Sequence, residues 1–274
     1  MSQLVAYWLA DELVTRELPD ASDAVMPGIA WGEFSNLFTP AYWVSQLWMA
    51  GLENQETSPY QAQGSLAEEL TFCMLGGFGI TAELATAAFH TCKATGLLNQ
   101  LNVSAKDWTE VLREPMALDG KMVKYRYPNQ KAIYLAEAMD FLRRGAADVS
   151  SGRALRDSLL TIRGVGPKTA GWVARNFLDS DDVAILDIHI IRAGQLCDLY
   201  TPQQKVEREY FEMEARYIEF CHGLSVRPAV IDCLIWDQMR TLGDVPLDAL
   251  RHKAGTNLNL ADPMRRGLQY SLAL

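Results

Sequence analysis

The stretch "TIRGVGPKTAGWVARNF" at residues 161–177 decides the fold of this chain. Two glycines and a proline interrupt an apolar pattern, and a lysine follows them directly. Gly164 and Gly166 permit a positive φ and a close approach of the backbone to another group. Pro167 suits the first turn of a helix, where its missing N–H is no loss. The stretch therefore predicts a helix–hairpin–helix whose second helix covers Pro167–Leu178.

The start of this second helix is a predicted anion site. Its first amides have no acceptor within the helix, and the positive end of the helix dipole lies behind them. A nucleic-acid phosphate fits such a site, and a monovalent cation could bind the same turn. An alternative is that the glycines serve only the packing of the two helices. The residues that we expect to contact the DNA backbone at this site are Arg163, Gly164, Val165, Gly166 and Thr169.

Lys168 and Asp187 are the candidate catalytic residues. Lys168 lies on the first turn of the second helix, where the dipole disfavours the ammonium form and so favours a nucleophilic amine. Asp187 follows nineteen residues later and precedes "IHIIRAGQLCDL" as an N-cap residue precedes its helix. A fixed carboxylate can stabilise a cationic sugar while the amine captures its C1′ atom. Alternatively, Lys168 is a surface lysine and Asp187 is only a cap.

Composition and charge limit the classes of protein that fit. The 274 residues carry a formal net charge of −9, which argues against general binding to nucleic acids. Residues 151–178 nevertheless hold five cations against one aspartate, and residues 111–131 are also rich in cations, which predicts a local anion-binding face. No uninterrupted apolar stretch is long enough to predict a membrane span. The five cysteines show no C-x-x-C spacing, which indicates buried, reduced thiols and no iron–sulfur cluster.

Helical patterns surround the central hairpin. Ser104 is expected to cap a helix that ends before Pro115, and Gly145 to end another. Residues 1–60 lack clear periodicity, so we expect short helices and ordered loops there. Strand signals are few, and the chain is predicted to be all-α. Amphipathic helical patterns cover residues 66–75, 82–98, 104–114, 129–145, 151–162, 188–199, 206–224 and 227–243.

Several of these segments resemble a known superfamily. "LLTIRGVGPKTAGWVARNF" with "VAILDIHIIR" looks like the helix–hairpin–helix, Gly/Pro-rich, Asp (HhH-GPD) superfamily of DNA glycosylases. "KYRYPNQKAIYLAEA" and "AVIDCLIWDQMRTLG" resemble segments of its 8-oxoguanine glycosylase branch. The resemblance covers residues 66–245. It implies a two-lobed helical fold with the active site in the cleft between the lobes, with Lys168 as the Schiff-base lysine and Asp187 as the essential aspartate.

The resemblance also suggests which residues line a base pocket. Trp236 and either Tyr125 or Tyr127 are candidates to stack on an everted base, because a base gains stability on an aromatic face. Trp172 and His189 are further candidates. For all five residues, ordinary packing in the core is the alternative. The segment after residue 245 is longer than in the short members of this branch, so their C-terminal base-reading contact is not carried over.

Function and organisation follow as expectations. We expect an unplaced N-terminal segment over residues 1–65, a glycosylase core over 66–245 with its hairpin at 154–178, and a C-terminal extension over 246–274. The expected activity is excision of 8-oxoguanine from double-stranded DNA with cleavage at the abasic site, by a cytoplasmic monomer, associated with the nucleoid if bacterial, without a cofactor. One alternative substrate is a bulky base such as glucosylated hydroxymethylcytosine of phage DNA, in an antiviral role. A non-catalytic DNA-binding module is the alternative of another class.

Overall fold

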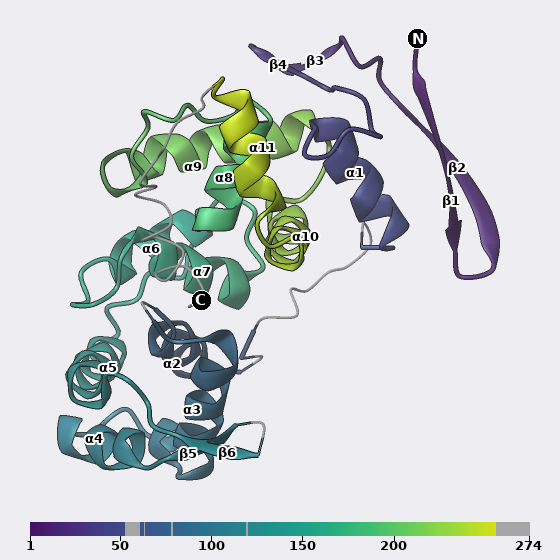
Figure 1. Cartoon of the computed structure of the whole chain (residues 1–274). Coiled ribbons are helices and arrows are strands. Elements are labelled where there is room, and N and C mark those ends of the chain that lie inside the picture. Colours follow the sequence, from purple (N-terminus) through teal and green to yellow (C-terminus); the bar gives the residue numbers. More distant parts are fainter. Residues whose placement is uncertain (53–60, 63, 78, 119, 256–274) are drawn as a thin grey trace. The chain divides into compact units, whose positions relative to one another are not determined.

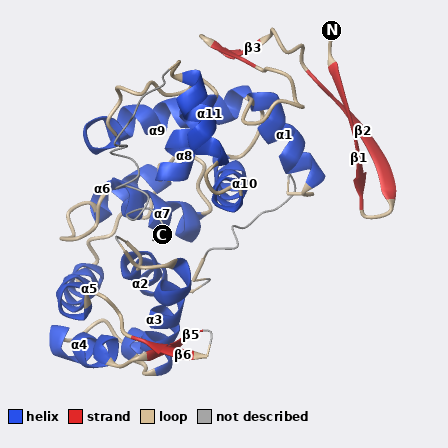
Figure 2. Cartoon of the chain, in the orientation of Figure 1, coloured by secondary structure: helices blue, strands red, loops and turns tan. Residues whose placement is uncertain are grey.

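The computed structural model describes residues 1–52, 61–62, 64–77, 79–118 and 120–255, and most of them are helical (Figures 1 and 2). The described chain forms two compact units. Unit 1 consists of residues 1–52 and 183–255, and unit 2 consists of residues 61–182. The prediction of a predominantly helical fold is confirmed. The predicted division at residues 65 and 245, and the expected cleft, stay predictions.

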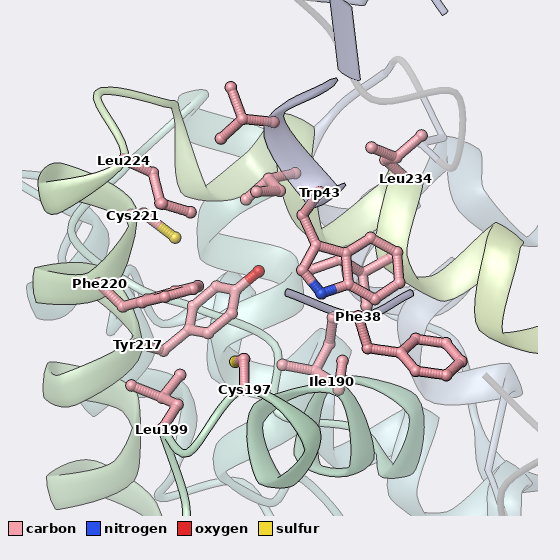
Figure 3. Packing of buried hydrophobic residues seen from close by; sticks show 14 of the residues in the cluster. Phe38, Trp43, Ile190, Cys197, Leu199, Tyr217, Phe220, Cys221, Leu224 and Leu234 are labelled. Atoms are coloured by element: carbon pink, nitrogen blue, oxygen red, sulfur yellow. The ribbon is translucent and has the colours of Figure 1, made fainter. Parts of the chain in front are cut away.

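Unit 1 combines helices with two small antiparallel sheets. Its helices are α1 (Pro40–Met49), α8 (Ile188–Leu196), α9 (Val206–Gly223), α10 (Pro228–Thr241) and α11 (Val245–Lys253). Its strands are β1 (Gln3–Leu9), β2 (Glu12–Leu18), β3 (Ala24–Met26) and β4 (Ile29–Ala30). Figure 3 shows the core, in which Trp43 of α1 lies among side chains of α8, α9 and α10. Trp43 is completely buried, so this aromatic anchors α1 to the helices that follow residue 183.

The expectation of short helices and loops is wrong for residues 3–30. β1 pairs with β2 from Gln3↔Leu18 to Leu9↔Glu12. Val5 and Tyr7 are buried, whereas Leu4 and Trp8 on the opposite face are exposed. Because large apolar side chains occupy both faces of β1, the alternation that would identify a half-buried strand is absent from the sequence.

Unit 2 contains the predicted hairpin. Its elements are α2 (Leu66–Leu75), α3 (Ala82–Ala94), η1 (Leu97–Asn99), α4 (Ala105–Arg113), β5 (Met116–Leu118), β6 (Lys121–Val123), α5 (Pro128–Arg143), α6 (Gly152–Leu159) and α7 (Pro167–Leu178). The β5–β6 pair is another departure from the all-helical expectation. Leu70 of α2, Leu112 of α4, Leu135 of α5 and Leu155 of α6 are completely buried.

Local signals predicted several helix ends correctly. α7 spans Pro167–Leu178 with Pro167 at its first position, as predicted. Ser104 caps α4 in a capping box with Asp107, and Gly145 follows α5 with a φ of 64°. These ends are set by side chains and backbone angles within a few residues, so the local sequence is enough to place them.

The cysteines are free, as expected. Cys73, Cys92, Cys197 and Cys221 are buried, and Cys233 is half-buried. Burial raises the pKa of the Cys92 and Cys197 thiols to about 12. These two thiols are therefore packing residues rather than nucleophiles at neutral pH.

Candidate active site

The hairpin turn between α6 and α7 relies on one glycine in the left-handed region. Gly164 has a φ of 86°, and a Cβ atom there would lie 2.2 Å from the ring of Tyr134. Glycine is therefore needed at this position for both its backbone angle and its size. Gly166 does not use the positive φ that glycine permits, because its φ is −98° and its ψ is 175°.

The N-terminus of α7 is open. Gly166 is its N-cap residue, and no side chain accepts a hydrogen bond from its first amides. A Cβ atom on Gly166 would have no heavy atom within 4 Å. The amides of Lys168 and Thr169 belong to the first turn, where the helix itself supplies no acceptor. The Val165 amide, by contrast, donates to the Ile162 carbonyl at 3.1 Å, so the turn itself uses one of the expected phosphate donors.

Lys168 is half-buried on the first turn of α7. Burial raises the pKa of the Cys73 thiol of α2, and the positive charge of Lys168 is a smaller influence in the opposite direction. Further along α7, the Trp172 ring meets the Phe72 ring of α2 edge to face, with the centroids 5.6 Å apart. The lysine therefore sits at the end of a packed α2–α7 interface.

Asp187 caps α8 in the predicted manner. Its Oδ1 atom accepts from the amides of His189 and Ile190, both at 2.9 Å, and the residue is 6% exposed. In the described part of the chain, no donor is assigned to the other oxygen, Oδ2. One oxygen thus fixes the carboxylate at the start of α8. A catalytic role for Asp187 beyond this cap stays a prediction.

The two candidate catalytic residues come from different units. Lys168 belongs to unit 2, and Asp187 belongs to unit 1. Each is held by its own unit, Lys168 through α7 and Asp187 through the amides of α8. Their meeting at one sugar stays a prediction.

The cationic face expected around the hairpin is smaller than the sequence indicates. Arg156 and Arg175 are 8% and 3% exposed, so they are interior residues. Arg153 donates to the Asp182 carbonyl oxygen at 3.0 Å. Arg163, the predicted phosphate ligand, forms an ion pair with Glu137 and lies over the Tyr134 ring. The positive charges that the sequence places together are thus mostly buried or engaged within the protein.

Two of the predicted base-pocket residues lie together in unit 1. Trp236 of α10 is half-buried, and its ring meets the His189 ring edge to face with centroids 6.3 Å apart. The guanidinium carbon of Arg240 lies 5.2 Å from the Trp236 ring centroid. Since the His189 amide also holds Asp187, this aromatic pair adjoins the candidate carboxylate.

The other aromatic candidates belong to unit 2. Tyr125 is 3% exposed and donates its hydroxyl to the Leu75 carbonyl, and burial raises its pKa. Trp172 is also 3% exposed and packs on Phe72. Both therefore pack in the core in this structure. Tyr127 is half-buried at the start of α5, with Arg126 over its ring.

The sequence reasoning missed a buried carboxylate close to α7. Glu69 of α2 is 2% exposed and accepts from the Asn176 side chain of α7 at 2.6 Å. A glutamate inside the apolar run "LAEELTFCML" is the signal that could have identified it, because a charge is rarely fully buried unless it is paired.

Neither a membrane-spanning helix nor a cluster of metal ligands is found among the described residues. In that part of the chain, no helix has both the length and the apolar character that a membrane crossing requires. Within the same residues, no three His, Cys, Asp or Glu side chains gather as a metal site. The cation at the hairpin stays a prediction.

Comparisons with known proteins agree on one family. The model of the 8-oxoguanine DNA glycosylase family matches residues 52–226. The 8-oxoguanine DNA glycosylase/AP lyase of Metallosphaera sedula is 32% identical over 123 residues, which covers 42% of this chain and 59% of that protein. The protein of the same name from Saccharolobus islandicus is 28% identical over 126 residues, with 42% and 60% covered. The match thus spans about three fifths of these relatives.

A solved structure is similar over a larger share of the chain. The crystal structure of Methanocaldococcus jannaschii 8-oxoguanine DNA glycosylase matches with a TM-score of 0.49 and 25% identity, covering 64% of this chain and 78% of that one.

Proposed function

The chain belongs to the 8-oxoguanine DNA glycosylase family, and on that premise we propose that it excises 8-oxoguanine from double-stranded DNA and cleaves the resulting abasic site. The observation that carries the proposal is the pair of helix starts. Lys168 stands on the open first turn of α7, and Asp187 is fixed at α8 through Oδ1 alone.

Binding begins at the hairpin. A backbone phosphate accepts from the open amides at the start of α7, with the helix dipole favouring its charge. Contacts of this kind position the duplex without reading its sequence. The modified nucleotide leaves the helical stack, because its C1′ atom is out of reach of a side chain while the base is paired. Trp236 supplies an aromatic face for the everted base.

The chemistry is a substitution at C1′. The bond from C1′ to the base breaks, and positive charge develops on the sugar. The Asp187 carboxylate stabilises that charge, while the Lys168 amine forms a bond to C1′. The base takes up a proton as it departs, the amine loses one, and opening of the sugar ring yields a Schiff base with Lys168. Loss of a proton from C2′ to water and departure of the 3′ phosphate then form a C2′–C3′ double bond and cleave the strand, and hydrolysis of the Schiff base frees Lys168.

The proposal extends to the setting of the reaction. The partner is double-stranded DNA that contains the modified base, and the enzyme acts on it as a cytoplasmic monomer. The open amides at the start of α7 hold the phosphate, and a monovalent cation bound at the hairpin turn would add to this contact. No step needs a redox cofactor.

Borohydride trapping tests the proposal, because a Schiff base is reduced to a stable amine that links protein to DNA. Wild-type protein should be trapped on duplexes that contain 8-oxoguanine or an abasic site, but not on unmodified DNA. Lys168→Gln should bind the same duplexes and give no trapped product. Equal trapping of Lys168→Gln would remove the nucleophile assignment. Trapping on glucosylated hydroxymethylcytosine but not on 8-oxoguanine would retain the chemistry and overturn the substrate.

A further inference from the structure

The interface between α2 and α7 contains a polar cluster in an otherwise apolar contact. Glu69 of α2 and Arg175 and Asn176 of α7 are 2%, 3% and 8% exposed. Buried polar groups of this kind need partners, and fully satisfied networks rigidify the elements that they join. The cluster lies on the helix that carries Lys168.

Glu69 joins three segments of unit 2. Its Oε1 atom accepts from Asn176 Nδ2 of α7 at 2.6 Å and from the Cys73 thiol at 3.6 Å. Its Oε2 atom accepts from the Ala62 amide, in the segment before α2, at 2.8 Å. Burial raises the pKa of the Glu69 carboxyl, and the hydrogen bonds from Asn176, Ala62 and Cys73 act in the opposite direction. All three donors therefore favour the charged carboxylate.

Asn176 is itself fixed in orientation. Its Oδ1 atom accepts from Arg175 Nε at 3.1 Å and from Arg175 Nη2 at 3.0 Å. Its amide nitrogen must therefore face Glu69, since a flipped amide would direct an N–H toward the guanidinium. The hydrogen bond between Glu69 and Asn176 thus has one allowed direction.

The contacts show that α2 and α7 are antiparallel. Glu69 meets Asn176, and Phe72, one turn further along α2, meets Trp172, one turn earlier in α7. Lys168, Trp172 and Asn176 recur at intervals of four, which places them along one face of α7. A rotation or shift of α7 on α2 would break the Glu69–Asn176 bond and would also displace the amine of Lys168.

We propose that Glu69 is a positioning residue, which locks α7 against α2 and thereby sets the direction in which the Lys168 amine reaches its substrate. This inference rests on the proposed function, because it assigns Lys168 the role of nucleophile. It assigns Glu69 no contact with DNA or with the reacting atoms.

The variant Glu69→Gln tests whether the hydrogen bonds of Glu69 hold α7 against α2, with minimal change in the shape of the side chain. A glutamine has one acceptor oxygen where the carboxylate has two. If that oxygen serves Ala62, the side-chain NH₂ group opposes the NH₂ group of Asn176; if it serves Asn176, the NH₂ group opposes the Ala62 amide. We expect the rate of borohydride trapping on an abasic duplex, at saturating protein, to fall about 10- to 100-fold because the nucleophile is misplaced. The Kd for the duplex should stay within about twofold, because the hairpin is intact.

The double variant Glu69→Gln with Asn176→Asp is the rescue. The introduced glutamine would accept from Ala62 and donate to the introduced carboxylate, whose other oxygen would accept from Arg175. The Ala62 and Arg175 donors then have acceptors again, and the charge beside Arg175 is restored; of the donors named above, only the weak Cys73 thiol lacks its acceptor. The trapping rate should return to within about threefold of wild type.

Leu112→Ala is the matched control for lost stability. Leu112 is completely buried in α4, away from the α2–α7 interface, and its truncation should lower Tm without lowering the trapping rate at saturating protein. Three results would overturn the inference: trapping by Glu69→Gln at the wild-type rate, an equal loss in Leu112→Ala, or a double variant that regains Tm but not rate. A wild-type protein that is never trapped would instead overturn the proposed function, and the two failures are therefore distinguishable.

Discussion

α7 and α8 differ in how the free amides of their first turns are satisfied. At α7 the N-cap residue is Gly166, and no side chain accepts from the first turn. At α8 the N-cap residue is Asp187, whose Oδ1 atom accepts from two amides. The N-terminus of α7 is therefore open to an external anion, whereas the N-terminus of α8 is already occupied by the Asp187 carboxylate.

Because of this difference, the helix start in each unit suits a different role in the proposed reaction. An open terminus can hold a phosphate, and a lysine beside it is placed next to the sugar of the same strand. A closed terminus cannot take another anion, but it presents a fixed carboxylate to a developing cation. The same backbone feature would thus serve binding in unit 2 and catalysis in unit 1.

The largest effect is expected at the closed terminus. Asp187→Asn keeps an acceptor for both amides but removes the charge, so excision of 8-oxoguanine should fall at least about 10²-fold in single-turnover assays. Thermal unfolding should change little, because asparagine caps a helix about as well as aspartate. Full excision by Asp187→Asn would show that Asp187 is only a helix cap and would contradict a catalytic role for the start of α8.

The open terminus can be blocked by a single methyl group. Gly166→Ala fits the observed φ of −98°, and its Cβ atom meets no heavy atom in the free protein. The methyl group would occupy the space where a phosphate approaches, so affinity should fall about tenfold, or about 1.4 kcal/mol, for duplexes of any sequence. Titrations with two unrelated sequences would measure this loss. Normal binding by Gly166→Ala would leave the turn with a packing role alone.

Gly164→Ala is the contrasting variant in the same turn. Its Cβ atom would clash with Tyr134, and its φ of 86° is strained for alanine. This variant should lose about 1–3 kcal/mol of unfolding free energy, whereas Gly166→Ala should lose almost none. Chemical denaturation of the two variants compares them directly, and equal losses would argue against an open N-terminus at α7.

An effect confined to one of two substrates is expected at the aromatic pair beside the closed terminus. Trp236→Ala removes a stacking face worth about 1–3 kcal/mol, so excision should fall about tenfold or more. Cleavage of a preformed abasic site should be nearly unchanged, because that substrate has no base to stack. Comparing the two substrates under the same conditions separates these roles. Equal losses on both would show that Trp236 supports the core next to His189 and Asp187.

The local features of the candidate site could be predicted from the sequence. The bounds of α7, Pro167 at its first position and Asp187 as the cap of α8 are as predicted. Each of these features depends on backbone angles and hydrogen bonds within about four residues. A positive φ explains the glycine at position 164 but not the one at position 166, because the extended φ of Gly166 at the N-cap does not require glycine.

Only the tertiary structure decided which side chains are buried and which pair with residues that are distant in the sequence. Sequence alone could not separate the buried Tyr125 and Trp172 from the half-buried Trp236, since burial of an aromatic side chain depends on which elements pack against it. Arg163 has its charge partner in α5, and Glu69 has its amide partner in α7. Burial and pairing depend on which helices pack together, and that is a property of the whole fold. The sequence by itself therefore determined where the helices of the site begin, and the tertiary structure decided which side chains remain available to a ligand.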